Sequence, residues 1–171
     1  MELINADALT VDFTSYRPDI IAGNLPYYVA TPLIESVVRL GLPGVFLIQK
    51  EVALRLAAGP GSRDYGFLTV QTQLFSTPTL EFTVPPTAFK PVPKVDSAEV
   101  TLRPRDRSTE LGIDNIEAFL HFVSVCFRQK RKMLRNNLRA EYPIDGQPEG
   151  QLRAEQLSIE DLAGLWRRLR A

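Results

Sequence analysis

The chain has 171 residues, and its 20 basic side chains balance its 20 acidic ones, so net charge alone indicates no polyanionic partner. Hydrophobic residues make up 44% of it, enough for a core, which excludes disorder of the whole chain and predicts one domain, or one domain with a small second one. One cysteine excludes an intrachain disulfide, and one cysteine with one histidine excludes a metal site of the usual zinc type. There is neither an apolar run of about 18 residues nor a signal-peptide pattern, so we expect a soluble, cytoplasmic protein that binds no membrane.

The first part of the chain alternates predicted strands and helices. Thr31 and Pro32 are typical of an N-cap and a first helical residue, apolar residues follow at helical spacing, and Gly41 can end the helix. Residues 65–75 fit either a strand, by their β-branched content, or a helix, by the spacing of their larger side chains. The predicted strands are at residues 19–23, 44–49, 79–84 and 98–102, and the predicted helices at residues 31–41 and 51–58.

This order of elements predicts an α/β fold. Two strand–helix alternations, followed by two strands that flank a proline-rich loop, indicate a sheet that ends in an antiparallel hairpin. The chain opens with what looks like the end of a strand, so we expect the sheet to lack a neighbour next to residues 19–23. An exposed edge there favours self-association with another chain, unless a displaced N-terminal segment covers it.

The C-terminal part is predicted to be a small all-α domain. The polar stretch at residues 103–112 has no apolar periodicity, which indicates a linker. The predicted domains are residues 1–104 and 112–171, with the linker at residues 105–111. The predicted helices run from a cap at Asp114 to Phe127, over residues 127–139, and over residues 158–170.

Asn24, Leu25, Pro26 and Tyr27 directly follow a predicted buried strand, the place where open α/β sheets bind their ligands. This segment suits a flat heteroaromatic ligand with an exocyclic amine. The carbonyl oxygen of the Asn24 side chain and a neighbouring main-chain carbonyl can accept both hydrogens of the amine, while Tyr27 stacks on the heteroaromatic ring. Such a cage directs the amine lone pair toward an electrophile, so no general base is required before attack. The alternative is an ordinary turn at a strand end, because Asn-x-Pro is common in turns.

A proline-rich loop, FKPVPKVDS, spans residues 89–97 and has Phe89 at its entrance. A phenylalanine on a rigid loop can form the second face of a base sandwich, and stacking of this kind contributes about 1–3 kcal/mol. The alternative is a surface loop with Phe89 packed in the core.

A compact positive patch lies in residues 127–139, FRQKRKMLRNNLR, where six side chains are basic and none is acidic. Contacts between these side chains and phosphates would make RNA binding sensitive to salt, whereas the alternative is a solvated helix face. His121 and Cys126 lie on an apolar predicted helix, so we expect both in or near the core. The candidate RNA-binding residues are Arg128, Lys130, Arg131, Lys132 and Arg135.

Four segments of the chain resemble a known family. NLPYYVATPLI, IQKEVALRLAAGPGSRDYG, VPPTAFKPVPKVDSAEV and FRQKRKMLRNNL occur in this order and together resemble the KsgA-type small-subunit ribosomal RNA adenine dimethyltransferases. The resemblance covers residues 5 to about 165 and implies a Rossmann-like class I methyltransferase sheet. It also implies an S-adenosylmethionine-dependent enzyme that dimethylates N6 of two adjacent adenines near the 3′ end of 16S ribosomal RNA, with the small ribosomal subunit as partner.

The resemblance further implies roles for individual residues. Asn24 to Tyr27 would form the catalytic cage for the target adenine, and Phe89 would stack on the flipped base. Asp7, in NADAL, corresponds to the family's GDAL aspartate, which accepts a hydrogen bond from the amine of the cofactor's adenine. Asn24 would also lie near the cofactor's methionine moiety. Taken without the family, Asp7 is typical of a helix or turn cap.

The resemblance is incomplete at the N-terminus. Family members extend further upstream, where a glycine-rich loop cradles the cofactor's methionine part and an acidic residue binds its ribose. We therefore expect this chain to be a fragment that binds the cofactor weakly or not at all and is inactive by itself. The alternative function is a non-catalytic module that binds the ribosome or its RNA.

Overall fold

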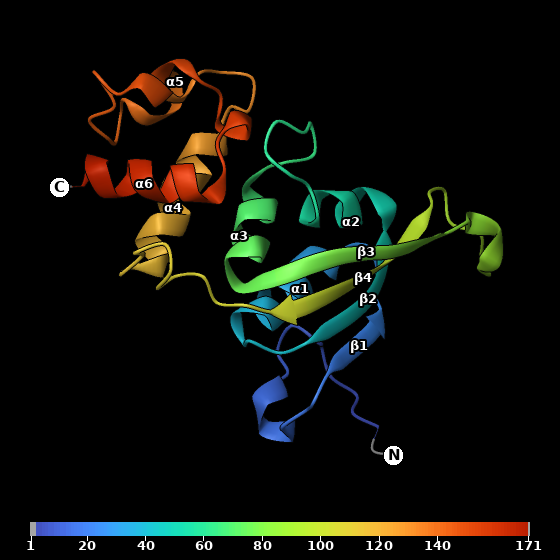
Figure 1. Cartoon of the computed structure of the whole chain (residues 1–171). Coiled ribbons are helices and arrows are strands. Elements are labelled where there is room, and N and C mark those ends of the chain that lie inside the picture. Colours follow the sequence, from blue (N-terminus) through green and yellow to red (C-terminus); the bar gives the residue numbers. More distant parts are fainter. Residues whose placement is uncertain (1–2, 171) are drawn as a thin grey trace. The chain divides into compact units, whose positions relative to one another are not determined.

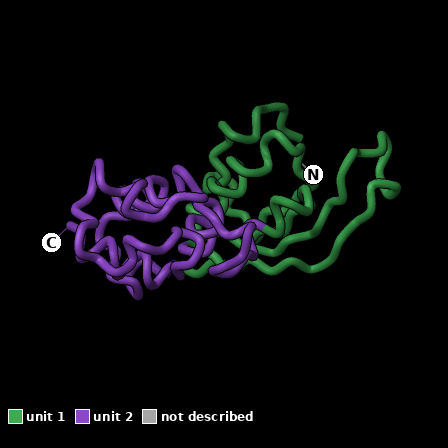
Figure 2. The backbone as a smooth tube through the Cα atoms, turned by 90° about the horizontal axis from the view of Figure 1, so that it is seen from above, with its two compact units in different colours: residues 1–54, 75–105 green, residues 55–74, 106–171 purple. Residues whose placement is uncertain are grey.

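The computed structural model describes residues 3–170, whose α-helices and strands are labelled in Figure 1. They form two compact units, residues 1–54 with 75–105 and residues 55–74 with 106–171 (Figure 2). The strands are β1 (Ile21–Asn24), β2 (Gly44–Gln49), β3 (Ser76–Val84) and β4 (Ser97–Pro104). The α-helices are α1 (Ala30–Arg39), α2 (Lys50–Leu56), α3 (Phe67–Phe75), α4 (Ile116–Phe127), α5 (Leu134–Leu138) and α6 (Ile159–Leu169). Short 3₁₀ turns are η1 (Phe13–Tyr16), η2 (Pro86–Ala88), η3 (Pro148–Gln151) and η4 (Ala154–Gln156).

The first unit is built on a mixed sheet of four strands in the order β1-β2-β4-β3 (Figure 1). β1 is parallel to β2, and β4 is antiparallel to both β2 and β3. The predicted α/β fold ending in an antiparallel hairpin is confirmed. Its core joins strand residues to the apolar face of α1, where Ile34 and Val37 are fully buried together with Phe46 of β2.

β1 lies at one edge of this sheet and has β2 on its inner side. Within residues 3–170 no strand pairs with its outer side, and the segment that precedes it contains a 3₁₀ turn, η1, rather than a strand. The open edge expected beside residues 19–23 is therefore present in the described part of the chain.

Both predicted helix caps differ from the observed ones. α1 begins one residue before Thr31, because the turn that ends β1 runs directly into the helix and the Val29 carbonyl accepts its first bond. The N-cap of α4 is Asn115, whose side chain accepts a hydrogen bond from the Ala118 N–H at 3.0 Å. Asp114 instead accepts a bond from Arg170 at 2.6 Å, so a distant partner takes the carboxylate away from the cap.

The ambiguous segment at residues 65–75 contains helix α3, not a strand. Thr69 and Gln73, one helical turn apart, face the end of α2 and bind its terminal carbonyls. Thr69 Oγ1 donates to the Arg55 carbonyl at 2.6 Å, and Gln73 Nε2 donates to the Leu56 carbonyl at 2.9 Å. These two bonds, made by polar side chains at helical spacing, stabilise a helix in this segment despite its β-branched residues.

The second unit has its own core of aromatic and aliphatic side chains. Phe119 of α4 packs edge-on against Trp166 of α6 with ring centres 5.5 Å apart, and Phe122 packs against Tyr142 at 5.1 Å. Leu134 of α5 is fully buried, which ties that short helix to the same core. No helix among residues 3–170 is long and apolar enough to cross a lipid bilayer.

The two residues expected in or near the core of α4 have different environments. Cys126 is buried, as predicted, and burial raises the pKa of its thiol. The expectation for His121 is wrong, because its side chain is 59% exposed and its Nε2 lies 2.9 Å from Glu141 Oε2. His121 therefore belongs to a surface ion-pair cluster.

The basic helix predicted over residues 127–139 is wrong. α4 ends at the start of this segment, residues 128–133 form turns, and helix resumes only in α5. Asn137 is buried, and its Nδ2 donates to the Cys126 carbonyl at 2.7 Å and to the Gln129 carbonyl at 3.3 Å. These bonds satisfy the carbonyl end of α4 from outside the helix, so the chain turns there despite its helix-forming composition.

The two units differ from the predicted domains. The division between residues 105 and 106 falls in the predicted linker, but Ser108 and Leu111 are buried in the second unit. That unit also includes residues 55–74, to which the Arg107 N–H is tied by a hydrogen bond to the Leu74 carbonyl at 2.9 Å. A contact of this kind, between segments that are distant in sequence, produces no local sequence pattern.

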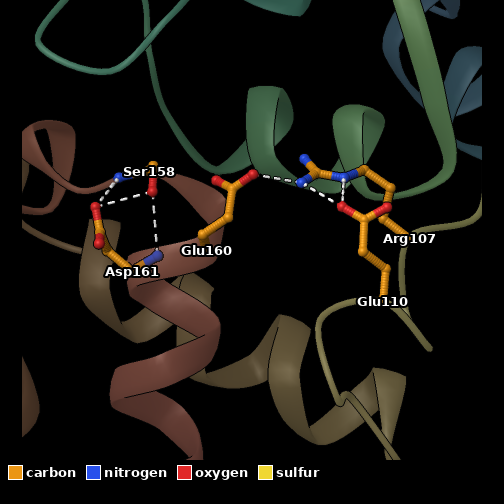
Figure 3. A network of polar contacts seen from close by, with 5 residues as sticks. All are labelled: Arg107, Glu110, Ser158, Glu160 and Asp161. Carbon is orange, nitrogen blue, oxygen red and sulfur yellow. Dashed lines mark hydrogen bonds and ion pairs between the residues drawn. The ribbon is translucent and has the colours of Figure 1, made fainter.

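A network of charged side chains joins the segment after β4, at Arg107 and Glu110, to α6 (Figure 3). Arg107 donates to Glu110 Oε1 at 2.9 Å and also to Glu160. Ser158 caps α6, accepting from the Asp161 N–H at 3.1 Å, while Asp161 Oδ2 accepts from the Ser158 N–H at 3.0 Å. The hydrogen bond from Arg107 lowers the pKa of Glu160 below its ordinary value of 4.5.

Replacing Glu160 with glutamine should lower the melting temperature at neutral pH and have a smaller effect in acid. A carboxylate whose pKa is lowered on folding adds stability above its ordinary pKa, and this stability is lost as pH falls through the folded value. Because the Glu160 side chain is 57% exposed, we expect an effect below about 1 kcal/mol. Thermal unfolding across pH checks this, with Asp145→Asn as the control. Equal destabilisation of Glu160→Gln at neutral and acid pH would contradict it.

Candidate functional site

The carboxyl ends of three strands lie at the same edge of the sheet in the first unit. β1 and β2 are parallel, β4 runs in the opposite direction, and β3 is antiparallel to β4, so β3 runs in the direction of β1 and β2. The segments that follow β1, β2 and β3 therefore start at this edge, where β4 also begins (Figure 1). Open α/β sheets bind their ligands at this edge.

A pocket of about 320 Å³, here named the Asn24 pocket, opens at this edge. One wall is the segment directly after β1, and the other is the proline-rich loop between β3 and β4. The structure thus brings Phe89 to the motif at residues 24–27, from which it is distant in sequence. The lining residues are Asn24, Leu25, Pro26, Tyr27, Phe89, Lys90, Pro91, Pro93 and Ser97.

Backbone bonds hold the segment after β1 in place. Leu25 is buried, and its N–H donates to the Leu47 carbonyl of β2 at 3.0 Å. The Pro26 carbonyl accepts from the Val29 N–H at 3.0 Å, which forms a turn that leads directly into α1. The proline ring fixes φ at the centre of this segment. Asn24 is therefore presented at the strand end on a rigid support.

Ser97 is a pocket residue that the sequence motifs did not single out. It is 2% exposed, it is the first residue of β4, and its Oγ lies 3.2 Å from Tyr27 Oη, within hydrogen-bond distance. The bond fixes one end of Tyr27, whose side chain is 36% exposed at the pocket. Ser97 closes the FKPVPKVDS motif, so its position was visible, but its partner depends on the pairing of strands far apart in sequence.

Phe89 is half-buried at the pocket and is not part of the core. Its N–H donates to the Pro86 carbonyl at 3.1 Å, and the Lys90–Pro91 peptide bond that follows is cis. The interpretation that places Phe89 in the core therefore does not describe this structure. Phe89 and Tyr27 border one pocket, an arrangement that can hold a planar ring between aromatic side chains.

The described lining of the Asn24 pocket has no carboxylate, imidazole or thiol. Its ionisable groups are the Tyr27 phenol and the Lys90 ammonium. The Asn24 side chain is exposed and makes no hydrogen bond within residues 3–170, so its carbonyl oxygen can accept from an amine. The arrangement can orient an amine but offers no strong base to deprotonate it. Over the same residues, no cluster of three or more histidine, cysteine or acidic side chains could hold a metal ion.

Asp7 does not line the Asn24 pocket. It is exposed, its Oδ1 accepts from the Leu9 N–H at 3.0 Å, and its carbonyl accepts from the Thr10 N–H at 2.9 Å. The turn-cap interpretation therefore describes its position here. Its Oδ2 has no hydrogen bond within the described residues and can still accept one from a ligand.

The predicted RNA-binding residues lie in the second unit, in the turns after α4 and in α5. A pocket of about 330 Å³ among these turns is lined by Gln129, Lys130, Arg131 and Lys132. Arg131, Lys132 and Arg135 are exposed and form no ion pair within residues 3–170. These three side chains are therefore available to an anionic partner.

The other two basic side chains have acidic partners. Arg128 lies 2.8 Å from Glu141 Oε1, and Lys130 lies 4.0 Å from Glu155 Oε2 and donates to the Arg63 carbonyl. Hydrogen bonds from His121 and Arg128 lower the pKa of Glu141, so its charge persists in mild acid. Any phosphate contact by Arg128 or Lys130 would compete with these acidic groups.

Comparisons with known proteins find similarity to enzymes that modify RNA. The profile of the family described as ribosomal RNA adenine dimethylase matches residues 1–162. A ribosomal RNA small subunit methyltransferase A from Acidobacterium capsulatum is 41% identical, over 98% of this chain and 64% of that protein. The protein of the same name from Xanthomonas axonopodis pv. citri is 41% identical, over 96% of this chain and 66% of that protein. The chain thus spans slightly less than two thirds of the length of these curated relatives.

Two solved structures are similar over nearly the whole chain. A dimethyladenosine transferase from Plasmodium falciparum is 26% identical with a TM-score of 0.75, over 96% of this chain and 70% of that one. The 23S rRNA methyltransferase ErmE is 25% identical with a TM-score of 0.67, over 99% of this chain and 72% of that one. The sheet is therefore of the Rossmann-like methyltransferase type, as the sequence predicted.

Proposed function

Because the chain belongs to the ribosomal RNA adenine dimethylase family, we propose that it acts in the dimethylation of N6 of two adjacent adenines in 16S ribosomal RNA. The methyl donor that we propose is S-adenosylmethionine, and the partner is the small ribosomal subunit. The observation that carries the proposal is the Asn24 pocket, where an exposed amide and two aromatic side chains meet at the ligand-binding edge of the sheet.

In this proposal the target adenine leaves its stack and enters the Asn24 pocket. Phe89 and Tyr27 contact the faces of the base, and the bond from Tyr27 to Ser97 keeps that ring in position. The Asn24 carbonyl oxygen accepts a hydrogen bond from the amine and orients its lone pair. The lone pair of this amine is partly delocalised into the adenine ring, and the hydrogen bond to Asn24 helps to localise it on the nitrogen for attack on the methyl group. The cationic amine that results then loses its proton to water, which agrees with the absence of a strong base from the described lining.

Two residues are proposed to meet the methyl donor. Asn24 lies at the carboxyl end of β1, next to the amine that it orients, and Asp7 keeps Oδ2 free to accept from the donor's adenine amine. When bound, S-adenosylmethionine supplies an electrophilic methyl group. Both residues offer acceptors of the required kind, so the described residues fit one side of such a ligand.

The second unit is proposed to dock on ribosomal RNA through Arg131, Lys132 and Arg135. Their lack of acidic partners within residues 3–170 supports this role, because a cation that is already paired gains less from a phosphate. Arg128 and Lys130 are proposed to contribute less than the other three, since each would have to leave a carboxylate.

A chimera tests whether the function is catalytic. This chain would replace the matched part of the Acidobacterium capsulatum relative, and unmethylated small ribosomal subunits would serve as substrate. We expect N6,N6-dimethyladenosine in the RNA, measured by mass spectrometry of its nucleosides, with the unaltered relative as positive control. Binding of the subunits without any methylated adenine would instead support the alternative, a non-catalytic ribosome-binding module.

Replacing Phe89 with alanine should weaken methyl transfer by the chimera by the worth of one base stack, about 1–3 kcal/mol. Phe89→Tyr should be tolerated, because it keeps the aromatic face. Phe82 is exposed on β3 and does not line the Asn24 pocket, so Phe82→Ala is the matched control. Single-turnover rates check the prediction, and a Phe89→Ala rate equal to that of the control would contradict it.

The outer edge of β1 is proposed to pair with another copy of the chain. The N–H groups of Ile21 and Leu25 donate to carbonyls at β2, so the alternation of a strand points the Ala22 N–H outward. Proline at residue 22 would remove this donor at an edge position that tolerates it. Sedimentation should show association that increases with concentration and is reduced by Ala22→Pro. A wild-type chain that stays monomeric would contradict this.

A further inference from the structure

A second pocket lies at the same edge of the sheet, within the first unit. Its volume is about 480 Å³, larger than that of the Asn24 pocket. Gln49, Lys50 and Leu54 line it from the end of β2 and from α2, and Pro86, Lys94 and Val95 line it from the loop between β3 and β4. The chemistry proposed for the Asn24 pocket does not use it.

One loop separates the second pocket from the Asn24 pocket. Pro93 lines the Asn24 pocket and the next residue, Lys94, lines the second pocket. Asp96 and Ser97 divide in the same way, with Asp96 in the second pocket and Ser97 in the Asn24 pocket. Because adjacent Cα atoms are only about 3.8 Å apart, the two pockets adjoin along this loop. A chain-like ligand that crosses this loop can therefore contact both pockets.

The loop is fixed against α2 by one of the lysines. The Lys50 N–H donates to the Asp96 carbonyl at 3.0 Å, and Lys50 Nζ lies 3.6 Å from Asp96 Oδ2. Lys94 is exposed and has no ion pair within residues 3–170, and the same is true of Lys90 at the Asn24 pocket. Each pocket thus has one lysine with no ion pair in the described structure, although the second pocket is also lined by the carboxylates of Glu51 and Asp96.

The second pocket also has apolar surface that is open to solvent. Leu54 is 41% exposed and Val95 is 44% exposed, and Pro86 stands beside them in the wall. Apolar side chains around a concavity with a few polar groups are typical of a ligand site. A flat base can contact this surface, while a phosphate at the mouth meets Lys94.

We propose that the second pocket binds the nucleotide directly next to the adenine in the Asn24 pocket, on one single strand of RNA. Leu54, Pro86 and Val95 contact its base, and Lys94 contacts its phosphate. The inference rests on the proposed function, because that function places an adenine in the Asn24 pocket. Two neighbouring pockets, each with one exposed lysine that forms no ion pair within residues 3–170, fit consecutive nucleotides of a strand better than a single free nucleotide.

Short single-stranded RNAs with a single adenine separate this inference from the function on which it rests. One RNA is intact, one lacks the adenine base, and two lack the neighbouring base on either side. For the full chain we expect loss of the adenine, and loss of one neighbour, to weaken binding about fivefold or more each. If only the adenine matters, the second-pocket inference is overturned and the proposed function stands. If the adenine does not matter, the proposed function fails and the inference fails with it.

Lys94→Ala tests the phosphate contact. It should reduce the slope of log affinity against log salt by about 0.7, the value for one phosphate on a single strand. It should also lose no further affinity when that phosphate is replaced by a neutral methylphosphonate, whereas Lys94→Arg should behave like wild type. Arg103 is exposed near the C-terminal end of β4, whereas the pockets lie at the start of that strand. Arg103→Ala is therefore the matched control. A wild-type slope for Lys94→Ala, or full additivity of the two changes, would overturn the inference.

Discussion

Replacing Asn24 with alanine should reduce methyl transfer by the chimera about 100-fold or more, the usual cost of removing one polar group aimed at the reacting atoms. The amide is the exposed acceptor of the Asn24 pocket, and the described lining has no carboxylate that could take its place. Affinity for RNA should change little, because the amide contributes little contact area compared with Phe89 and Tyr27. The expected loss is therefore in the rate of the bound complex.

Single-turnover rates and RNA affinities of the Asn24→Ala chimera separate these effects. The melting temperature serves as the control for folding, since Asn24 is exposed at a strand end and supports no core contact. A rate above about a tenth of the wild-type value would contradict the assignment, because an oriented polar contact should contribute more than that.

Reversing the charges of Arg131, Lys132 and Arg135 to glutamate should cause the largest loss of affinity for ribosomal subunits. These side chains are exposed and unpaired within the described residues, so each can release a counterion when it meets a phosphate. For each phosphate that the variant no longer neutralises, the slope of log affinity against log salt should fall by about 0.9 on a duplex or about 0.7 on a single strand.

Charge reversal at Arg17, Arg39 and Arg103, which are exposed in the first unit, controls for the change in net charge. This control should leave the slope close to wild type. If the Arg131, Lys132 and Arg135 variant also kept the wild-type slope, these residues would be a solvated surface with no part in RNA binding.

The first unit could be predicted well because its signals are local. The apolar run at residues 44–49 is β2 with the predicted bounds, and the apolar periodicity after Thr31 is α1, although its cap differs. The motif at residues 24–27 could be placed at a strand end for the same reason. The parallel pair of β1 and β2 and the antiparallel hairpin of β3 and β4 also agree with the predicted sheet, whereas the position of β4 between β2 and β3 was not predicted.

What could not be predicted depends on contacts between distant segments. The buried Asn137 side chain binds the Cys126 carbonyl at the end of α4, where composition favoured a continued helix. His121 pairs at the surface with Glu141, which is twenty residues away in sequence. The bond from Tyr27 to Ser97 and the second pocket both require knowledge of how β4 pairs. Neither feature has a sequence pattern of its own.

Nuclear magnetic resonance of the full chain with a short RNA that contains a single adenine tests whether this base enters the Asn24 pocket. We expect the H2 and H8 resonances of the adenine to move upfield, because the base lies against the Phe89 and Tyr27 rings. We also expect the Asn24 side-chain amide resonances to move and Phe89→Ala to reduce the upfield shift. Bound RNA whose adenine resonances and Asn24 amide resonances stay unchanged would show that the adenine does not bind in this pocket.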